Sequence, residues 1–344
     1  MRAVVLTKFG GPQYLEAATL SDPVPGPGEV LLRVRACALN HLDLWIRAGL
    51  PGSKVKLPHI LGCDAAGEVV ALGPGAEGVS LGGRFAVHPG RSCARCDACR
   101  DARDPDCPSY GIIGAYGGLP GAYAELLAVP VEHLLSMPDS LSFIDASAVP
   151  LTFLTAWHML TTSARLRPGE TALVVGAGAG VAVAAIQIAK LAGARVIATS
   201  TSKEKLEAAR GLGADETIHH PPEDLVRAVR RLTKGRMADV VFEHVGVAVL
   251  MEALKCLRPS GRLVTCGATS GALAEIDLRY VFSRRLSLLG STMGNLAEMR
   301  RVWALAAEGR LKPVVDRTYP LEQARQAHER LEAGGQFGKV VLTA

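Results

Sequence analysis

Between about residues 140 and 290, short apolar runs alternate with segments of helical character, and this alternation limits the possible folds more than any other feature. Helices such as 203–212 and 222–232 separate the runs. Strands divided by helices of about ten to fifteen residues predict an α/β fold with a parallel, doubly wound sheet. Strand twist makes its crossovers right-handed. The expected strands are 171–175, 195–199, 216–218, 240–243, 261–266 and 287–290.

The segment before this region, residues 1 to about 135, is mostly β in character, with apolar runs separated by turns rich in Pro and Gly. One helix is expected near 41–48. After a helix near 296–308 the chain ends in an apolar run, 338–342, which we expect to return to the first domain as a strand. The predicted domains are therefore a discontinuous first domain, 1–137 with 306–344, and a second domain, 138–305.

Four cysteines lie close together in the first domain. Cys93, Cys96, Cys99 and Cys107 follow the pattern C-x2-C-x2-C-x7-C, in a lobe of about 90–110. Four thiolates gathered by tight turns suit one tetrahedral zinc ion, and such a closed site leaves no open position for a substrate, so the zinc is expected to be structural. Disulfides, free thiols and an iron–sulfur cluster are the alternatives. Disulfides are rare in cytosolic proteins, and the usual spacing of a ferredoxin cluster differs.

Composition bounds the function classes. The 344 residues are 49% hydrophobic and 21% charged, as in an ordinary water-soluble protein of two domains. The net charge of +5 favours anionic ligands such as phosphates but is far from a nucleic-acid-binding signature. The stretch 171–189 carries no charge, yet its three glycines divide it into a strand, a turn and a buried helix, which argues against a membrane span. No secretory signal is visible, so a cytoplasmic protein is expected.

The turn VVGAGAGVA, residues 174–182, joins a predicted strand to a predicted helix. Gly176, Gly178 and Gly180 let the backbone approach a pyrophosphate, whose charge is met by the amides of the helix N-terminus. The pattern departs from G-x-G-x-x-G, because Val181 stands where the third glycine would fall. An ordinary tight turn is the alternative, but the further strand–helix units favour dinucleotide binding.

The residues after the second strand bear on the choice of nicotinamide coenzyme. NAD-binding sheets usually place a carboxylate there to accept hydrogen bonds from the ribose 2′-hydroxyl. This chain instead has Ser200, Ser202 and Lys203, whose hydroxyls and charge suit a 2′-phosphate. NADP(H) is therefore expected, with NAD less favoured. Ser202 also suits the N-cap of the following helix, and the two roles are compatible.

Taken together, these parts resemble the medium-chain dehydrogenase/reductase family over essentially the whole chain. LNHLDLWIRAG (39–49) is similar to the N-x-x-D-x3-R-x-G run of its quinone oxidoreductase branch, and LGCDAAG (61–67) to that branch's G-x-[DE]-x-x-G turn. TAW at 155–157, VFEHVG at 241–246 and GATSG at 267–271 also match. The resemblance implies a GroES-like β-rich catalytic domain and a Rossmann domain. It further implies coenzyme contacts at Thr155, Ala179, Val181, Val245, Gly267, Ala268, Ser291 and Lys339.

Two departures from the family pattern bear on the chemistry. Zinc alcohol dehydrogenases of this family hold a catalytic zinc at positions that correspond to about Asn40, Cys63 and Leu151. An amide is a poor zinc ligand and a hydrocarbon is none, so no catalytic zinc is expected. Conversely, quinone oxidoreductases usually lack a four-cysteine lobe. The alternative is a metal held by Cys63 together with a neighbour, namely His41, His59 or Asp64.

Without a catalytic metal, the resemblance points to hydride transfer onto an enone or a quinone, whose developing enolate is stabilised by hydrogen-bond donors. Asn40 is the candidate donor, and His41 or water the candidate proton source, with Tyr116 and Tyr123 as further proton donors. Asn40 is also suited to cap the helix that follows it.

The neighbouring residues have structural interpretations beside the catalytic one. Cys63 is expected to be a small buried residue, and Asp64 to organise a turn or pair with an arginine, although both belong to the candidate site by resemblance. Asp43 and Arg47 stand i,i+4 on the predicted helix, so a surface ion pair is expected.

The leading hypothesis is an NADPH-dependent, zinc-independent reductase of quinones or α,β-unsaturated carbonyls, with one structural zinc. The alternatives are a zinc-containing alcohol dehydrogenase with atypical ligands and a non-catalytic NADPH-binding assembly protein. The expected partners are a small-molecule carbonyl or quinone, bound in the cleft between the domains, and further copies of the chain in a homodimer or homotetramer.

Overall fold

The computed structural model describes residues 1–344, and its contacts divide the chain into two compact units. The first is Met1–Leu154 with Met293–Ala344, and the second is Thr155–Thr292. The boundaries between the units lie at 154/155 and 292/293, whereas the sequence predicted them at 137/138 and 305/306. Helix α10 (Leu296–Ala307) belongs to the first unit because the Trp303 indole N–H donates to the Ser136 carbonyl and the Asn295 amide to the Ala102 carbonyl, each at 2.8 Å.

The second unit is built on a six-stranded sheet with the order β13-β12-β11-β14-β15-β16, and every neighbouring pair is parallel. The doubly wound parallel sheet predicted from the sequence is therefore confirmed. All residues of β11 and β14 are buried, as expected for a sheet covered on both faces. The strands are β11 (Thr171–Val174), β12 (Arg195–Ser200), β13 (Glu216–His219), β14 (Ala238–Glu243), β15 (Leu257–Thr265) and β16 (Ser287–Gly290).

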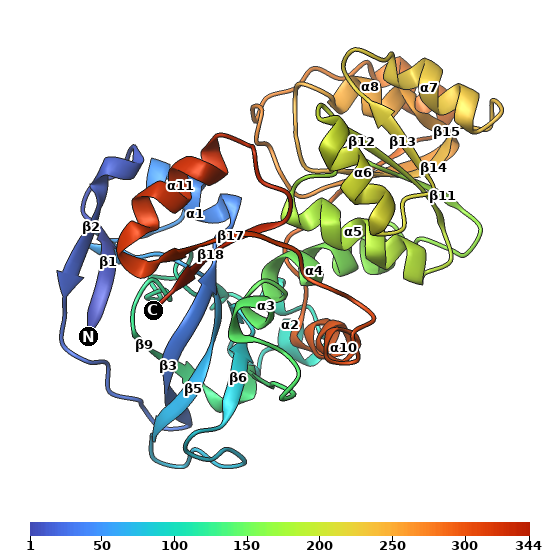
Figure 1. Ribbon diagram of the computed structural model, residues 1–344. Helices are drawn as coiled ribbons and strands as arrows, with labels where there is room; N and C mark the ends of the chain where they lie inside the picture. Colours follow the sequence, from blue (N-terminus) through green and yellow to red (C-terminus); the bar gives the residue numbers. More distant parts are fainter. The chain divides into compact units, whose positions relative to one another are not determined.

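Helices cover both faces of this sheet (Figure 1). Helices α7, α8 and α9 share one apolar core with the sheet, whereas α5 and α6 pack against β11, β12 and β13. The uncharged stretch 171–189 forms β11, the glycine turn and most of α5. None of the helices has the length and apolar content needed to cross a bilayer. The helices are α5 (Gly180–Leu191), α6 (Lys203–Gly211), α7 (Leu225–Leu232), α8 (Leu250–Lys255) and α9 (Leu278–Arg284).

The first unit is mainly antiparallel β structure. Its largest sheet has the order β10-β6-β5-β3-β18-β17, with β9 also paired to β3 (Figure 1). The last strand, β18, pairs antiparallel with β3, so the end of the chain lies in the first unit. A second sheet has the order β2-β1-β4. The strands are β1 (Arg2–Leu6), β2 (Leu15–Thr19), β3 (Glu29–Ala38), β4 (His59–Ile60), β5 (Asp64–Leu72), β6 (Arg84–Val87), β7 (Gly90–Arg91), β8 (Gly111–Ile112), β9 (Leu126–Pro130), β10 (Leu134–Ser136), β17 (Val315–Pro320) and β18 (Lys339–Thr343).

Close packing between β3 and β5 fixes the strand ends that carry the candidate site. Gly67 stands opposite Val34, and a Cβ atom on Gly67 would lie 2.1 Å from the carbonyl oxygen of Arg33. Only glycine fits there, because the backbone cannot move away without breaking the strand pairing. The remaining helices are α1 (His41–Ala48), α2 (Asp97–Arg100), α3 (Phe143–Ser147), α4 (Pro150–Trp157) and α11 (Ala324–Glu332).

Candidate functional site

Asn40 stands where β3 ends and α1 begins, and it is 5% exposed. Its backbone N–H donates to Asp43 Oδ2 at 2.7 Å, so Asn40 occupies the N-cap position that the sequence suggested. Its side-chain amide donates to Asp64 Oδ2 at 2.9 Å and to Cys63 Sγ at 3.3 Å. The residue therefore combines a position at the helix start with side-chain bonds to the two other site residues predicted from the sequence.

Lys339, the first residue of β18, joins the same cluster. Its ammonium group donates to Asn40 Oδ1 at 2.5 Å and to Asp64 Oδ2 at 3.1 Å, and its side chain is 4% exposed. Asp64 is fully buried and also accepts the backbone N–H of Leu151 at 2.9 Å. We call Asn40, Cys63, Asp64 and Lys339 the Asn40 network. Lys339, expected as a coenzyme contact, thus neutralises a buried carboxylate within the first unit.

The Asn40 network offers a metal few usable ligands. Burial, followed by the charges of Asp64 and Asp43, raises the pKa of the Cys63 thiol well above its ordinary value. The Asp64 carboxylate is already bonded to Lys339, Asn40 and the amide of Leu151. A metal needs thiolate, imidazole or free carboxylate donors, and the network supplies a thiol, an amide and a paired carboxylate.

Asp43 and Arg47 do not form the surface ion pair that their spacing suggested. Asp43 is 1% exposed and accepts the Gly62 N–H at 3.1 Å, and Arg47 is 3% exposed and pairs with Glu332 of α11. The expectation was wrong because α1 packs both of these side chains inward against the rest of the first unit, which the i,i+4 spacing cannot reveal.

The other proton-donor candidates lie in different surroundings. His41 is partly buried at the first position of α1, and Tyr116 is partly buried. Tyr123 is fully buried, and its hydroxyl lies 3.0 Å from His328 Nε2. Tyr110 was not selected from the sequence, and its hydroxyl is buried without a hydrogen-bond partner. Burial, followed by the charges of Asp104 and Cys63, raises the pKa of Tyr110.

The four lobe cysteines come together as predicted. Their Sγ atoms all lie within 4.8 Å of one another, and the Cys96–Cys99 and Cys93–Cys99 separations are 3.5 and 3.9 Å. Tetrahedral Zn–S bonds of about 2.3 Å require sulfur–sulfur separations of about 3.8 Å. Hydrogen bonds from the backbone amides of Arg95 and Cys96 lower the pKa of Cys93 to about 6. At Cys96 the Cys99 amide acts in the same direction, but burial and the neighbouring thiols outweigh it and raise the pKa to about 11.

All eight cysteines are free, so the lobe contains no disulfide. The lobe is fixed to the rest of the first unit by the start of α10, where the Leu296 N–H donates to Asp104 Oδ2 at 2.9 Å. The donor set and its spacing fit a structural zinc held by Cys93, Cys96, Cys99 and Cys107.

In the second unit, the predicted coenzyme turn follows β11, at the point where the strand order reverses between β11 and β14. Open α/β sheets bind ligands at such a switch point. Gly176 has φ +72°, and its N–H donates to Thr199 Oγ1 at 3.4 Å. A Cβ atom on Gly178 would lie 2.6 Å from the Lys205 side chain. The absence of a side chain at Gly178 therefore lets Lys205 pack against the turn, which places a cation where a pyrophosphate would bind.

The loops after β14 and β15 complete this edge of the sheet. The buried Glu243 carboxylate accepts the N–H groups of Val245 and Gly246 at 2.5 and 2.6 Å and the Thr265 hydroxyl at 2.8 Å. His244 Nε2 and Ser291 Oγ are buried without a hydrogen-bond partner. Unsatisfied buried polar atoms are uncommon in folded proteins, and two at one edge fit a bound ligand that supplies their partners.

Of the residues expected to select the coenzyme, Ser202 also has a structural role at the start of α6. Ser202 Oγ accepts the Lys205 N–H at 3.2 Å, which makes Ser202 the N-cap of α6, and it donates to Glu204 Oε2 at 2.5 Å. Ser200 is buried and Lys203 is exposed. The sequence reasoning missed Lys205 and Glu204, one cation and one anion at the start of α6. The remaining expected contacts lie in α4, the glycine turn, α5 and the loops after β14 and β15: Thr155, Ala179, Gly180, Val181, Val245, Gly267 and Ala268.

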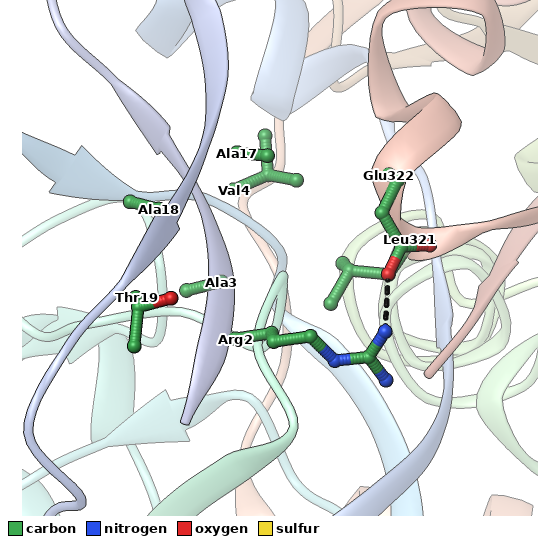
Figure 2. Close-up of a pocket in the computed structure, with 8 residues that line it drawn as sticks. All are labelled: Arg2, Ala3, Val4, Ala17, Ala18, Thr19, Leu321 and Glu322. Atoms are coloured by element: carbon green, nitrogen blue, oxygen red, sulfur yellow. Dashed lines mark hydrogen bonds and ion pairs between the residues drawn. The ribbon is translucent and has the colours of Figure 1, made fainter.

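A shallow surface pocket of the first unit is separate from these residues. Val4 and Ala17 of the β1–β2 pair line one side, and Leu321 and Glu322 the other (Figure 2). Glu322 forms an ion pair with Arg2 at 2.7 Å. None of the candidate catalytic or metal-binding residues lines this pocket.

Comparison with known proteins agrees with this geometry. The Alcohol dehydrogenase GroES-like domain matches residues 26–139, and the Zinc-binding dehydrogenase family matches residues 180–308. The chain belongs to the medium-chain dehydrogenase/reductase family. It is therefore an NAD(P)-dependent oxidoreductase, which excludes the non-catalytic alternative.

Relatives within this family have two different names. An NAD-dependent alcohol dehydrogenase of Sulfurisphaera tokodaii is 33% identical, and a quinone oxidoreductase of Pseudomonas aeruginosa is 34% identical; each match covers 99% of both chains. A crystal structure of an NAD-dependent alcohol dehydrogenase is 46% identical, with a TM-score of 0.96 over 100% of both chains. The fold and the oxidoreductase class are shared, and the reaction must be argued from the site.

Proposed function

We propose that this chain reduces quinones or α,β-unsaturated carbonyls with NADPH and uses no catalytic metal. The observation that carries the proposal is the Asn40 network. At the positions where zinc alcohol dehydrogenases of the family place their ligands, this chain has an amide bonded to Asp64, one buried thiol and Leu151. Oxidation of a simple alcohol relies on a Lewis acid to stabilise the alkoxide, whereas an enone spreads the incoming electron pair onto its carbonyl oxygen.

The reaction follows from this difference. A bound NADPH would supply the hydride to the β-carbon of an enone, the electron pair of the C=C bond would move to the carbonyl oxygen, and a proton would complete the saturated product. The buried Lys339 ammonium contributes positive charge to the Asn40 network, although Asp64 offsets much of it. Because the amide of Asn40 already donates to Asp64 and Cys63, we assign Asn40 to holding Lys339 and Asp64 in place.

Two groups of the first unit are the candidate proton sources. His41 stands at the first position of α1, next to Asn40. The Tyr110 hydroxyl is buried without a partner, so a substrate oxygen would satisfy it. Tyr110→Phe removes this hydroxyl with little change of volume, and a loss of turnover in that variant with unchanged coenzyme affinity would select Tyr110 over His41.

NADPH is proposed over NADH because Ser200 ends β12, and Lys203 and Lys205 stand in the first turn of α6, which follows it. Glu204 lies beside Ser202 and opposes a 2′-phosphate, so the preference is expected to be moderate. Lys203→Ala should raise the KM for NADPH several-fold and leave that for NADH unchanged. Lys205→Ala, near the glycine turn, should raise both. An equal effect of Lys203→Ala on the two coenzymes would contradict the assignment.

The experiment that tests the reaction is NADPH oxidation followed at 340 nm with a panel of quinones and enones. We expect acceptor-dependent oxidation that a weak chelator of exposed metal leaves unchanged. Cys63→Ala provides the matched variant: a thiol that holds no metal can be removed with at most a few-fold loss of turnover. Chelator sensitivity together with inactivation by Cys63→Ala would refute the metal-free mechanism.

A zinc-containing, NAD-dependent alcohol dehydrogenase is the second candidate, and the names of two similar proteins favour it. In that case alcohols would be oxidised with NAD, and purified chains would contain about two zinc ions. Under the first proposal they contain about one, bound by the four lobe cysteines.

We also propose a homo-oligomer, as a dimer or a tetramer. Strand β16 is the edge of the second unit's sheet, and it is mostly exposed. Phe282 and Leu278 of the adjacent α9 are 70% and 71% exposed, and Leu273 is 91% exposed. An exposed edge strand beside large apolar side chains is a surface that a second copy can cover. Light scattering of the wild type and of Phe282→Glu tests this, and a monomeric wild type would contradict it.

A further inference from the structure

The four-cysteine lobe is hydrogen-bonded to the start of α10 at two points. The Asn295 side-chain amide donates to the Ala102 carbonyl at 2.8 Å, and the Leu296 N–H donates to Asp104 Oδ2 at 2.9 Å. Ala102 and Asp104 both lie between the third and fourth cysteines of the lobe, and Figure 1 shows α2 of the lobe beside α10. The metal-ligating segment and the beginning of α10 are therefore in direct contact.

The lobe has almost no core of its own. Of residues 91–110, Cys107 alone is buried, and neither α2 nor the short 3-10 turn Asp104–Asp106 contains a buried residue. A segment that buries so little apolar surface cannot offset its conformational entropy by packing, so the bonds of a zinc ion would have to hold its shape. The positions of the Ala102 carbonyl and the Asp104 carboxylate then depend on that zinc.

Asn295 has two roles, and they use different atoms. Its Oδ1 accepts the Glu298 N–H at 2.8 Å, and its backbone N–H donates to Glu298 Oε2 at 3.0 Å, which forms the capping box of α10. Its Nδ2 makes the bond to the lobe. Serine caps a helix about as well as asparagine, but its hydroxyl is one bond closer to the backbone than the amide nitrogen. Asn295→Ser therefore removes the bond to the lobe and keeps the cap.

The residues just before α10 carry the chain from the second unit to the first. The crossing at 292/293 lies within residues 291–295, which belong to no helix or strand. At the beginning of this segment, the Ser291 N–H donates to the Thr265 carbonyl of β15 at 2.9 Å. The connecting segment 291–295 is thus fixed by the sheet of the second unit at one end and by the lobe at the other.

Ser291 links this segment to coenzyme binding. It is an expected coenzyme contact, and its hydroxyl oxygen is buried without a hydrogen-bond partner. Close packing leaves little slack between Ser291 and the lobe, because a Cβ atom on Gly294 would lie 2.7 Å from Leu154 Cδ1. A closely packed segment transmits a displacement instead of absorbing it. A change in the lobe can therefore reach the Ser291 hydroxyl.

We propose that Asn295 and Asp104 are positioning residues through which zinc in the lobe orders the connecting segment and places the Ser291 hydroxyl for the coenzyme. The structural zinc acts on coenzyme binding in this way without contacting the coenzyme. The inference goes beyond the proposed function, since it depends neither on the acceptor nor on the choice between NADPH and NADH. The coupling is reciprocal, so loss of the bond from the α10 side also weakens the retention of zinc.

Hydrogen exchange of the full-length protein, followed by mass spectrometry, tests the ordering without turnover. Asn295→Ser should speed exchange in peptides that cover 291–299 by about five-fold, as expected for the loss of one neutral hydrogen bond. Cys96→Ser, from which zinc is lost, should show at least the same increase, and Asn295→Ser should add nothing to it in the double variant. Trp303→Phe, which removes the bond from α10 to the Ser136 carbonyl, is the matched control and should leave these peptides unchanged.

Two further readouts use the same proteins. Transfer of zinc to a chromogenic chelator should be about five-fold faster in Asn295→Ser than in the wild type or in Trp303→Phe; because this is measured on zinc-loaded protein, it tests the coupling even if Cys96→Ser fails to fold. The Kd of NADPH or NADH, whichever the wild type binds more tightly, should rise several-fold in Asn295→Ser and Asp104→Ala. Asp104→Asn keeps an oxygen acceptor for the Leu296 N–H and should restore most of the affinity.

Two results would overturn the inference. If Asn295→Ser speeds exchange equally with and without zinc, the lobe does not order the connecting segment through this bond. If exchange and zinc transfer both become faster while the Kd of the coenzyme stays unchanged, Ser291 is not placed by the lobe. Because none of these measurements involves acceptor reduction, a failure of the proposed reaction would leave them intact.

Discussion

Replacement of Lys339 by methionine tests the central ion pair of the site most severely. Lys339 Nζ and Asp64 Oδ2 are 3.1 Å apart, with side chains 4% and 0% exposed. At an effective dielectric constant of about 20, two unit charges at this separation attract by about 5 kcal/mol, much of which offsets their desolvation. Removal of one partner leaves the other buried and unpaired, which costs about 3–5 kcal/mol.

We therefore expect Lys339→Met to lower the free energy of unfolding by about 4 kcal/mol. For a unit of this size, about 2–4 °C is lost per kcal/mol, so the midpoint of thermal unfolding should fall by roughly 8–16 °C in circular dichroism. Asp64→Asn in the same chain removes the orphaned charge and should recover most of the loss. Lys255→Met, at an exposed lysine of α8, is the matched control and should change the midpoint by less than about 2 °C.

The same variant decides between two roles for Lys339. If Lys339 serves only as the buried partner of Asp64, Lys339→Met should change the affinity of the folded protein for NADPH by no more than a few-fold. If Lys339 contacts the coenzyme directly, Lys339→Met should weaken that affinity, as Lys203→Ala does. A destabilisation below about 1 kcal/mol, or one that Asp64→Asn fails to reverse, would refute the account of the buried pair.

Two further predictions concern stability. Burial raises the pKa of Asp43 from 3.8 to about 7. The stability that protonated Asp43 contributes is therefore fully present below about pH 4 and is lost as pH rises through 7. Asp43→Asn should remove up to about 4 kcal/mol of the fall in unfolding free energy between pH 4 and 8, measured by urea titration at each pH. An unchanged dependence of that free energy on pH would contradict this. Gly67→Ala should destabilise the protein by at least about 2 kcal/mol, because the new Cβ would lie 2.1 Å from the Arg33 carbonyl oxygen. Gly211→Ala, at the end of α6 with open space around it, should instead stabilise the protein by up to about 1 kcal/mol. Equal melting temperatures of the two variants would argue against the packing described.

The sequence was sufficient for features that depend on local pattern. The alternation of apolar runs and helices specifies the parallel sheet, because each strand–helix unit must bury the same faces. The spacing of the four cysteines placed their sulfur atoms together, since tight turns leave few arrangements for ligands this close in sequence. The glycine turn likewise lies at the end of β11 at the switch point of the sheet.

Features made by distant residues were not predictable in this way. Lys339 is 299 residues from Asn40, and His328 is 205 residues from Tyr123. Local sequence patterns cannot predict contacts between residues this far apart, because these contacts depend on how β18 and α11 pack in the first unit. The i,i+4 spacing of Asp43 and Arg47 suggested a surface pair, but the face that α1 buries determines their partners. Glu204 bonds Ser202 from the first turn of α6, beyond the strand end where NAD-binding sheets usually place a carboxylate, so the usual pattern does not predict it.

The zinc content of purified, active enzyme tests the metal-free reaction most directly. Elemental analysis should give about one zinc ion per chain, and Cys96→Ser should reduce this to near zero. A second tightly bound ion in the wild type, retained in Cys96→Ser and lost in Cys63→Ala, would contradict the account.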